Sequence, residues 1–380
     1  MEELQIYGIV NSVTSQALGR TDLTVVNEQG LIALGNTVLD SSTHTEDFLN
    51  TLVRRIGKTI VSTRAYSNKF SGLMKDNFQW GSIVQKIKVH MPTAEEDESY
   101  NLTDNGTVDH YKINKPKAMQ KLFITDSPYQ FKITIQRVHL ETAFTSASAM
   151  GSFIGAVYTE VQNAIELALE NLARTCLANY MGELYEVDSE EGTLPGARVF
   201  NLVSMYKTAT GDTSITASTA MFNEAFLRYA IQQIKIISSR FTNMTTGLFN
   251  DGTTTRHTPL SMQKLYILDI FESALETQVQ YGAFNKQYVE LNGFQQVSFW
   301  QDIKTPNSIK VARASDNAVI EVSNIVGALF DTEALGMYQQ KQWTATTPFN
   351  AAGGYINTYW HEKQLWFNDL SENFVIFTLN

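Results

Sequence analysis

Few segments of the sequence contain residue types that could carry out chemistry. Gly57-Lys58-Thr59 resembles the end of a phosphate-binding loop, but Leu52 occupies the position of the first required glycine. Cys176 is the single cysteine and could in principle be a nucleophile. It falls on the apolar stripe of a predicted helix, which favours a buried structural thiol. Neither segment therefore predicts an active site.

The histidines and clustered acids could in principle bind a metal ion. His90 and His110 flank the acidic run Glu95–Glu98 and could face each other across a hairpin. A cross-strand polar pair is the preferred interpretation of these histidines. The acidic run lacks the alternating ligands of a calcium loop, so we interpret it as a solvated loop. The sequence thus predicts no catalytic residue, no metal site and no cofactor.

The composition defines the class of protein. The chain has 380 residues, of which 43% are hydrophobic and 18% are charged, so it can bury a sizeable core and is not disordered. A net charge of −10 argues against a protein that coats nucleic acid. One cysteine excludes an intrachain disulfide framework. Neither a signal peptide nor a run of ~18 apolar residues is evident, so we expect a soluble protein.

The N-terminal segment lacks a clear hydrophobic period. Residues before about 45 are predicted to form an extended arm. A short helix then begins at Thr45, with Phe48, Leu52 and Ile56 on one face and Gly57 as its stop.

Two alternating segments predict half-buried strands that project as long β-arms. In Gly81–Met91, the apolar residues fall on one side and Lys86 and Lys88 on the other, which we take as the exposed face. Phe131–Arg137 alternates again, and turn signals lie between the two segments.

The clearest element is a helix of about 30 residues over Gly151–Met181. Val157, Val161, Ile165 and Leu172 recur at helical spacing and are predicted to pack against a sheet. The remaining predicted elements are a helix at Thr219–Ile237, a polar loop at Thr242–Pro259, a strand at Lys264–Ile270, a helix at Phe271–Gln280, and strands at Gln296–Trp300, Ile309–Ala312, Val319–Val322, Val326–Phe330 and Asn373–Leu379.

The charges are distributed unevenly. Residues 1–53 carry seven acids and one base, whereas residues 64–137 carry 11 bases and eight acids. We therefore predict that the acidic N-terminal arm lies against the basic β-arm of an adjacent subunit. The contact residues that we expect are Glu2, Glu3, Asp22, Glu28, Lys86, Lys88, Lys112, Lys115 and Lys117. Each exposed pair would contribute only ~0–1 kcal/mol.

The order of these elements resembles that of bacteriophage major capsid proteins of the Hong Kong 97 phage type. Three short stretches resemble the versions found in short-tailed phages of the picovirus type. Asp47–Gly57 is similar to the helix before their extended loop, and Leu140–Phe144 to the entry of their long spine helix. Gly354–His361 with Asn373–Phe377 is similar to their closing strands.

This resemblance implies an α+β Hong Kong 97-like capsid fold with four parts. They would be an N-terminal arm and short helix at 1–61, an extended β-loop at 62–137, a peripheral domain with the spine helix at 138–200 and 331–380, and an axial domain at 201–330. An additional immunoglobulin-like domain is expected to be absent.

The resemblance also implies a non-enzymatic subunit that self-assembles into hexamers and pentamers of an icosahedral-type virion shell. Such a shell would enclose double-stranded DNA and would be built in the bacterial cytoplasm with a separate scaffolding protein and a portal protein. The DNA would be contacted weakly and without sequence specificity, and no membrane would be involved. Two alternatives are an encapsulin-like nanocompartment that holds protein cargo and an unrecognised soluble enzyme.

Overall fold

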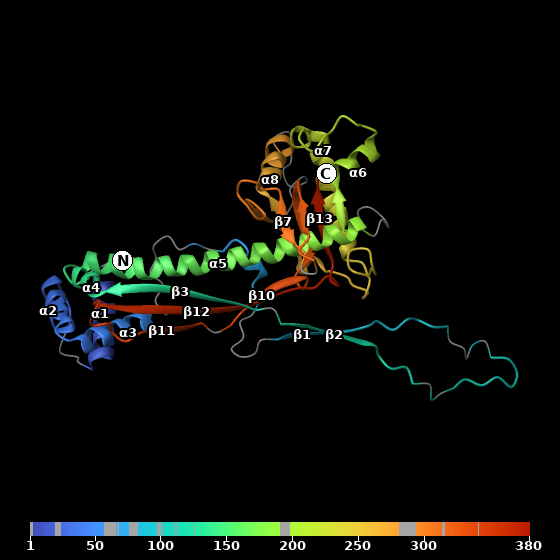
Figure 1. Ribbon diagram of the computed structural model, residues 1–380. Coiled ribbons are helices and arrows are strands. Elements are labelled where there is room, and N and C mark those ends of the chain that lie inside the picture. The colour runs from blue at the N-terminus through green and yellow to red at the C-terminus, as the bar shows by residue number, and fades with distance from the viewer. Residues whose placement is uncertain are drawn as a thin grey trace. The chain divides into compact units, whose positions relative to one another are not determined.

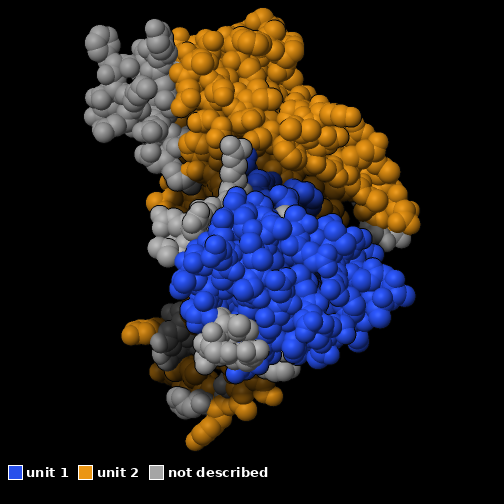
Figure 2. Space-filling view, turned by 90° about the vertical axis from the view of Figure 1, so that its left-hand side faces the viewer, with its two compact units in different colours: residues 1–81, 126–172, 338–365 blue, residues 82–125, 173–337, 366–380 orange. Residues whose placement is uncertain are grey.

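The computed structural model describes residues 3–19, 24–56, 66, 68–75, 83–96, 100, 102–109, 111, 113–124, 126–190, 198–280, 294–313, 316–340 and 342–380. The chain mixes helices and sheets and divides into two compact units (Figures 1 and 2). Unit 1 comprises Met1–Gly81, Asp126–Leu172 and Tyr338–Leu365, and unit 2 comprises Ser82–Thr125, Ala173–Met337 and Trp366–Asn380. The Gly57-Lys58-Thr59 segment lies outside the described residues.

The N-terminal segment of unit 1 is helical, so the predicted extended arm is wrong. It forms α1 (Glu3–Leu18), α2 (Glu28–Leu39) and α3 (Ser42–Ile56). Asn27 begins α2, because its side-chain oxygen accepts a hydrogen bond from the Gly30 amide at 2.8 Å. The apolar residues do recur at helical spacing, but the interspersed glycines disguise the period. The predicted short helix is confirmed as α3, which begins three residues before Thr45.

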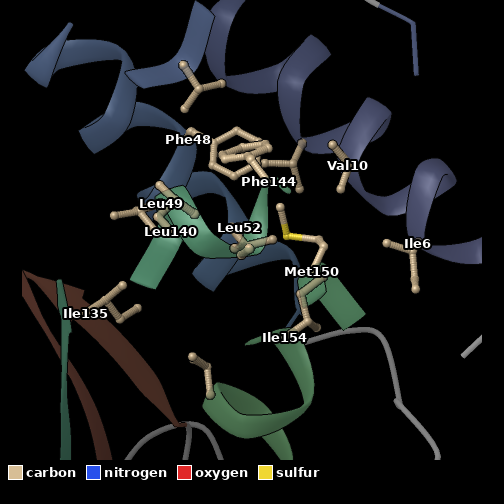
Figure 3. Close-up of a cluster of buried hydrophobic side chains, with 14 of the residues drawn as sticks. Ile6, Val10, Phe48, Leu49, Leu52, Ile135, Leu140, Phe144, Met150 and Ile154 are labelled. Atoms are coloured by element: carbon tan, nitrogen blue, oxygen red, sulfur yellow. The ribbon is translucent and has the colours of Figure 1, made fainter. Parts of the chain in front are cut away.

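These helices pack around the first turns of the chain's longest helix. Phe48 of α3 and Phe144 lie with ring centroids 5.4 Å apart, among the buried side chains shown in Figure 3. Gly35 of α2 passes so close to Phe144 that a Cβ atom at this position would lie 2.6 Å from the Phe144 Cβ. A glycine is therefore required where α2 crosses this ring.

A four-stranded sheet completes the architecture around this core. It consists of β3 (Asp126–Gln136), β10 (Leu335–Gln339), β11 (Trp343–Thr346) and β12 (Tyr355–Asn368). β12 pairs antiparallel with β3 over 11 residue pairs, from Tyr355↔Gln136 to Leu365↔Asp126. This pairing confirms the strand predicted at Phe131–Arg137. The short helix α4 (Arg137–Ala143) follows β3.

The long predicted helix is confirmed and extended as α5 (Ala147–Glu190), which has 44 residues. Val157, Val161 and Ile165 are buried in the unit 1 core, as predicted from their spacing. Cys176 is buried in unit 2, where its thiol contacts the Asn368 side chain at 2.9 Å. Burial raises the pKa of this thiol to about 12, so it remains protonated.

Unit 2 is built on a five-stranded mixed sheet in the order β4-β13-β9-β5-β6. Its strands are β4 (Val199–Asn201), β5 (Gln263–Leu268), β6 (Phe294–Val297), β9 (Ile325–Asp331) and β13 (Phe374–Thr378). Helices α6 (Leu202–Thr210), α7 (Glu224–Phe241) and α8 (Asp269–Leu275) share its core. Short turns of other helix types lie at Ala220–Phe222, Leu260–Met262 and Glu276–Gln280 of unit 2, and another lies at Ser71–Leu73 of unit 1. The predicted elements of this region are thus present, with α7 shifted toward the C-terminus.

Two further strand pairs belong to unit 2. They are β7 (Ile309–Ala312) with β8 (Val319–Val322), and β1 (Val84–Val89) with β2 (Ala118–Phe123). Figure 1 labels β1 and β2, and we call this antiparallel pair the hairpin. Among the described helices, none combines the length and the hydropathy needed to cross a bilayer.

The core position of α5 predicts the effect of truncating its buried face. Ile165→Ala should lower the free energy of unfolding by ~2–5 kcal/mol, because it leaves a cavity in the unit 1 core. Leu167 lies on the same helix but is 50% exposed, so Leu167→Ala should change stability by less than ~0.5 kcal/mol. Denaturant unfolding of both variants checks this expectation. Equal stabilities would show that Ile165 does not face a core.

Candidate functional site

The hairpin places three lysines on one of its faces. In the antiparallel register of β1 and β2, Lys86 lies opposite Lys121, and Lys88 lies opposite Met119. Directly opposed residues project from the same face of a sheet, so the three lysines point together. On the same face, Phe123 contacts Phe367, with ring centroids 5.0 Å apart. We call this the lysine face, and it consists of Val84, Lys86, Lys88, Met119, Lys121 and Phe123.

The lysine face meets carboxylates in the turn between β12 and β13. Asp369 organises this turn, because its Oδ1 accepts hydrogen bonds from the Ser371 amide at 3.2 Å and hydroxyl at 2.6 Å. The side chains of Asp369 and Glu372 are only 0% and 2% exposed. Ionised carboxylates buried to this degree are stable only beside cations or strong hydrogen-bond donors.

The lysine ammonium groups supply that compensation. Lys86 Nζ lies 2.5 Å from Glu372 Oε1 and 3.0 Å from Asp369 Oδ2. Lys88 Nζ lies 2.8 Å from Glu372 Oε1 and 3.1 Å from Asp369 Oδ2, and it also donates to the Ser371 hydroxyl. Lys121 Nζ lies 2.8 Å from Asp369 Oδ1. Each buried carboxylate is therefore contacted by two or more cations.

Further ion pairs around these buried carboxylates involve more exposed side chains. Arg256 lies 2.8 Å from Glu372, Lys86 lies 3.3 Å from Glu333, and Lys121 lies 3.9 Å from Asp251. Four cations thus meet four carboxylates, so the group as a whole is neutral. We call it the root cluster, and it consists of Lys86, Lys88, Lys121, Arg256, Asp251, Glu333, Asp369 and Glu372.

The root cluster controls the ionisation of its carboxyls. Burial opposes the ionisation of Asp369, but hydrogen bonds from Lys121 and the charges of Lys86 and Lys88 outweigh it. The pKa of Asp369 consequently lies far below its usual value. Glu372 behaves alike, since the charges and hydrogen bonds of Lys86 and Lys88 outweigh its burial and lower its pKa.

A buried glutamate of unit 1 provides an internal comparison. Burial raises the pKa of Glu362 to about 7, although a hydrogen bond from the neutral Gln339 amide at 2.9 Å acts in the opposite direction. The nearby carboxylate of Glu166 raises this pKa further. The cations of the root cluster therefore keep Asp369 and Glu372 ionised, although the burial of these carboxyls acts against ionisation.

The structure reverses the predicted orientation of the hairpin. Lys88 is 5% exposed, whereas Ile87 and Val89 are 63% and 64% exposed. The expectation that the lysines occupy the exposed face is wrong, because the carboxylates of the same chain attract them inward. Sequence reasoning also missed Asp369, Glu372 and Arg256. The available signal was the mostly polar stretch Asp369–Asn373, which lies directly before the strongly apolar strand β13.

The other predicted contact residues are not members of the root cluster. Glu28 is exposed in the first turn of α2, and Lys115 and Lys117 are exposed on the segment that leads into β2. Glu2, Asp22, Lys112 and the side chain of Glu3 lie outside the described residues. His110 lies outside them as well, and no group of three or more potential metal ligands occurs within the described ranges.

The burial of Lys88 predicts a stability effect. Lys88→Met keeps most of the side-chain volume but leaves Asp369 and Glu372 one cation short. The loss should be about 3 kcal/mol, at the lower end for a broken buried pair, because Lys86 and Lys121 remain. The exposed Lys117 supplies the control, and Lys117→Met should change stability by less than ~0.5 kcal/mol. Chemical denaturation of the unassembled chain measures the unfolding free energy of both variants. Similarly small losses of unfolding free energy in the two variants would contradict a buried cluster.

The lowered pKa values predict a pH dependence with a definite sign. Asp369 and Glu372 bind protons more weakly in the folded chain than in the unfolded chain. Their stabilising contribution is therefore present above the ordinary carboxyl pKa of about 4 and is lost as the pH falls below it. Glu372→Gln should be less stable than the parent at pH ~7, and the difference should shrink on acidification. Unfolding of both proteins measured over a pH series tests this prediction. A difference in unfolding free energy between parent and variant that stays constant with pH would refute it.

Comparisons with known proteins agree with this architecture. A family model described as Phi29-like phage major capsid protein matches residues 10–378. The major capsid protein of Bacillus phage GA-1 is 23% identical over 178 residues, which cover 47% of this chain and 37% of that protein. The major capsid protein of Streptococcus phage Cp-1 is 23% identical over 142 residues, covering 37% of this chain and 38% of that protein. The matched segments thus span less than two fifths of either relative.

Solved structures show the same fold. A chain in the capsid structure of Staphylococcus phage Andhra aligns with a TM-score of 0.52 and 12% identity, covering 85% of this chain and 87% of that chain. A chain in a head-fibre and inner-core structure of bacteriophage P68 aligns with a TM-score of 0.52 and 14% identity, over the same shares of both chains. The predicted α+β Hong Kong 97-like fold is confirmed. Because the family model spans nearly the whole sequence, the chain belongs to the Phi29-like family of phage major capsid proteins.

Proposed function

We propose that this chain is the non-enzymatic major subunit of an icosahedral-type shell that encloses a phage double-stranded DNA genome. Family membership over residues 10–378 is the observation that carries the proposal. The root cluster supports a structural role, because buried charges of this chain hold a hairpin in place. Its cations and carboxylates form ion pairs with one another.

The proposed partners follow from the same role. Copies of the chain would form hexamers and pentamers, built in the bacterial cytoplasm with a separate scaffolding protein and a portal protein. A net charge of −10 suits weak contact with packaged DNA, because each phosphate contact adds salt-sensitive affinity that would hinder packaging and release. The peripheral and axial domain boundaries stay predictions within this proposal.

The structure changes which lysines are available for the proposed contact between neighbouring subunits. Lys86 and Lys88 already have carboxylate partners within their own chain. The contact of the acidic residues Glu2, Glu3, Asp22 and Glu28 with a neighbour's hairpin would therefore depend mainly on Lys112, Lys115 and Lys117. Lys115 and Lys117 are exposed and available for such pairs.

A phage of the short-tailed picovirus type is the proposed source, because the Phi29-like family model agrees with the three stretches that resemble such phages. The same family match favours a DNA-containing shell over the encapsulin-like nanocompartment. Neighbouring genes for a terminase and a portal protein would support the phage assignment, whereas a gene for a cargo enzyme would support the nanocompartment.

The experiment is expression of the chain with and without its neighbouring genes, followed by negative-stain microscopy. We expect closed shells of uniform size when the scaffolding gene is present, and aberrant or few particles without it. A protein that stays monomeric under both conditions would contradict the proposed function.

A further inference from the structure

A buried polar site lies on one face of β12 in unit 1. Ile356, Trp360 and Glu362 fall on this face, and the first two belong to the same core as the buried side chains of α5. Glu362 is 4% exposed, and Gln364, two residues further on, is completely buried. The side chain of Glu362 therefore lies in surroundings that oppose a charge.

Glu362 has only neutral hydrogen-bond partners among the described residues. Its Oε2 atom accepts a hydrogen bond from the Gln339 amide at 2.9 Å and a longer one from the Gln364 amide at 3.4 Å. Gln339 belongs to β10, so the carboxyl joins β10 to β12. Within the described ranges no lysine, arginine or histidine forms an ion pair with Glu362, whereas the buried carboxylates of the root cluster are paired with lysines.

The titratable groups around Glu362 do not supply a cation either. Glu166 of α5 is half-buried, and its carboxylate disfavours a second negative charge nearby. Tyr129 of β3 lies directly opposite Glu362 in the register, and therefore on the same face of the sheet. Glu170, one turn further along α5, accepts a hydrogen bond from the amide of Lys69, which is an exposed residue.

A buried acceptor without a partner lies beside the carboxyl. Gln364 Oε1 accepts no hydrogen bond from the described residues. The nitrogen of the same amide already contacts Glu362, at 3.4 Å. An ionised carboxylate can only accept hydrogen bonds, whereas a neutral carboxyl has one O–H donor. A proton on Glu362 would thus supply the donor that this buried oxygen lacks, and leaving such an oxygen unpaired is costly.

We propose that Glu362 is a proton-controlled contact: its neutral carboxyl holds β10 and β12 together in the unit 1 core, and loss of the proton above neutral pH loosens that contact. In the neutral state the Glu362 hydroxyl donates to Gln364 Oε1 after a rotation of the Gln364 amide, while Gln339 still donates to Glu362. In the ionised state the proton has passed to water, and a charge is buried near Glu166 without a cation. The inference concerns the free chain and does not rest on the proposed function.

The position of Glu362 along the chain extends the effect of this contact. The site is built on β10, β12 and α5, and each of these elements continues from one unit into the other a few residues away. The boundaries fall after Leu172 in α5, after Met337 in β10 and after Leu365 in β12. Loss of the proton should therefore also make the segments that connect the two units more mobile.

The proposed proton site gives the chain a pH dependence opposite in sign to that of Asp369 and Glu372. Burial raises the pKa of Glu362 from 4.5 to about 7, so the folded chain holds this proton where the unfolded chain has released it. The contribution of Glu362 to stability therefore falls as the pH rises through this window and then levels off. Glu362→Gln is neutral at every pH and should lack this loss. The unfolding equilibrium constants of parent and variant should diverge by ~10-fold or more at pH ~8.

Denaturant unfolding of the unassembled chain between pH ~5 and pH ~8 measures this divergence. Glu96 is exposed, so Glu96→Gln serves as the control and should follow the parent at every pH. Amide hydrogen exchange locates the change. At pH ~8 the amides of β10 and β12 should exchange faster in the parent than in Glu362→Gln, whereas the two proteins should agree closely at pH ~5.

Each outcome decides the proposal. A divergence between the parent and Glu362→Gln that grows with pH, together with faster exchange in β10 and β12 of the parent, supports it. An identical pH dependence of the two proteins, or equal exchange at pH ~8, overturns it. A Glu362→Gln chain that does not fold, or that is less stable than the parent at pH ~8, would show that the fold requires the charged form and would also overturn it.

Discussion

Two almost fully buried carboxylates constrain the orientation of the hairpin in this structure. Asp369 and Glu372 can stay ionised inside unit 2 only if cations reach them, and Lys86, Lys88 and Lys121 do so from the two strands of one hairpin. Meeting this requirement determines which face of the hairpin turns inward. The apolar side chains on the opposite face of both strands, such as Ile87 and Leu122, are consequently exposed.

The root cluster also links distant parts of the chain. Lys88 and Ser371 are 283 positions apart in sequence, so docking of the hairpin joins two distant segments of the chain. Contacts of such long sequence separation slow folding. Buried ion pairs contribute little net stability compared with apolar contacts, whereas leaving one partner alone is costly. The root cluster therefore mainly fixes the hairpin in a single orientation. The apolar cores of the two units supply most of the stability.

Much of the fold was predictable from local periodicity. The spacing of Val157, Val161 and Ile165 correctly placed the long helix against a core, and alternation identified β1 and β3. The N-terminal helices were missed because Gly8, Gly30 and Gly35 obscured the helical period and led to the prediction of an extended arm. Tertiary packing tolerates these glycines, and Gly35 is required beside Phe144. The root cluster could not be predicted from the sequence. An alternation of period two identifies the two faces of a strand, but it does not indicate which face meets buried carboxylates almost 300 residues later.

The central claim is that the lysine face pairs with carboxylates of its own chain. A high-resolution cryo-electron microscopy map of assembled shells tests it most directly, at the root of the hairpin in each independent subunit. The account predicts that the Lys88 side chain meets Asp369 and Glu372 of the same chain in every copy. Lys88 paired with a carboxylate of a neighbouring subunit would contradict it.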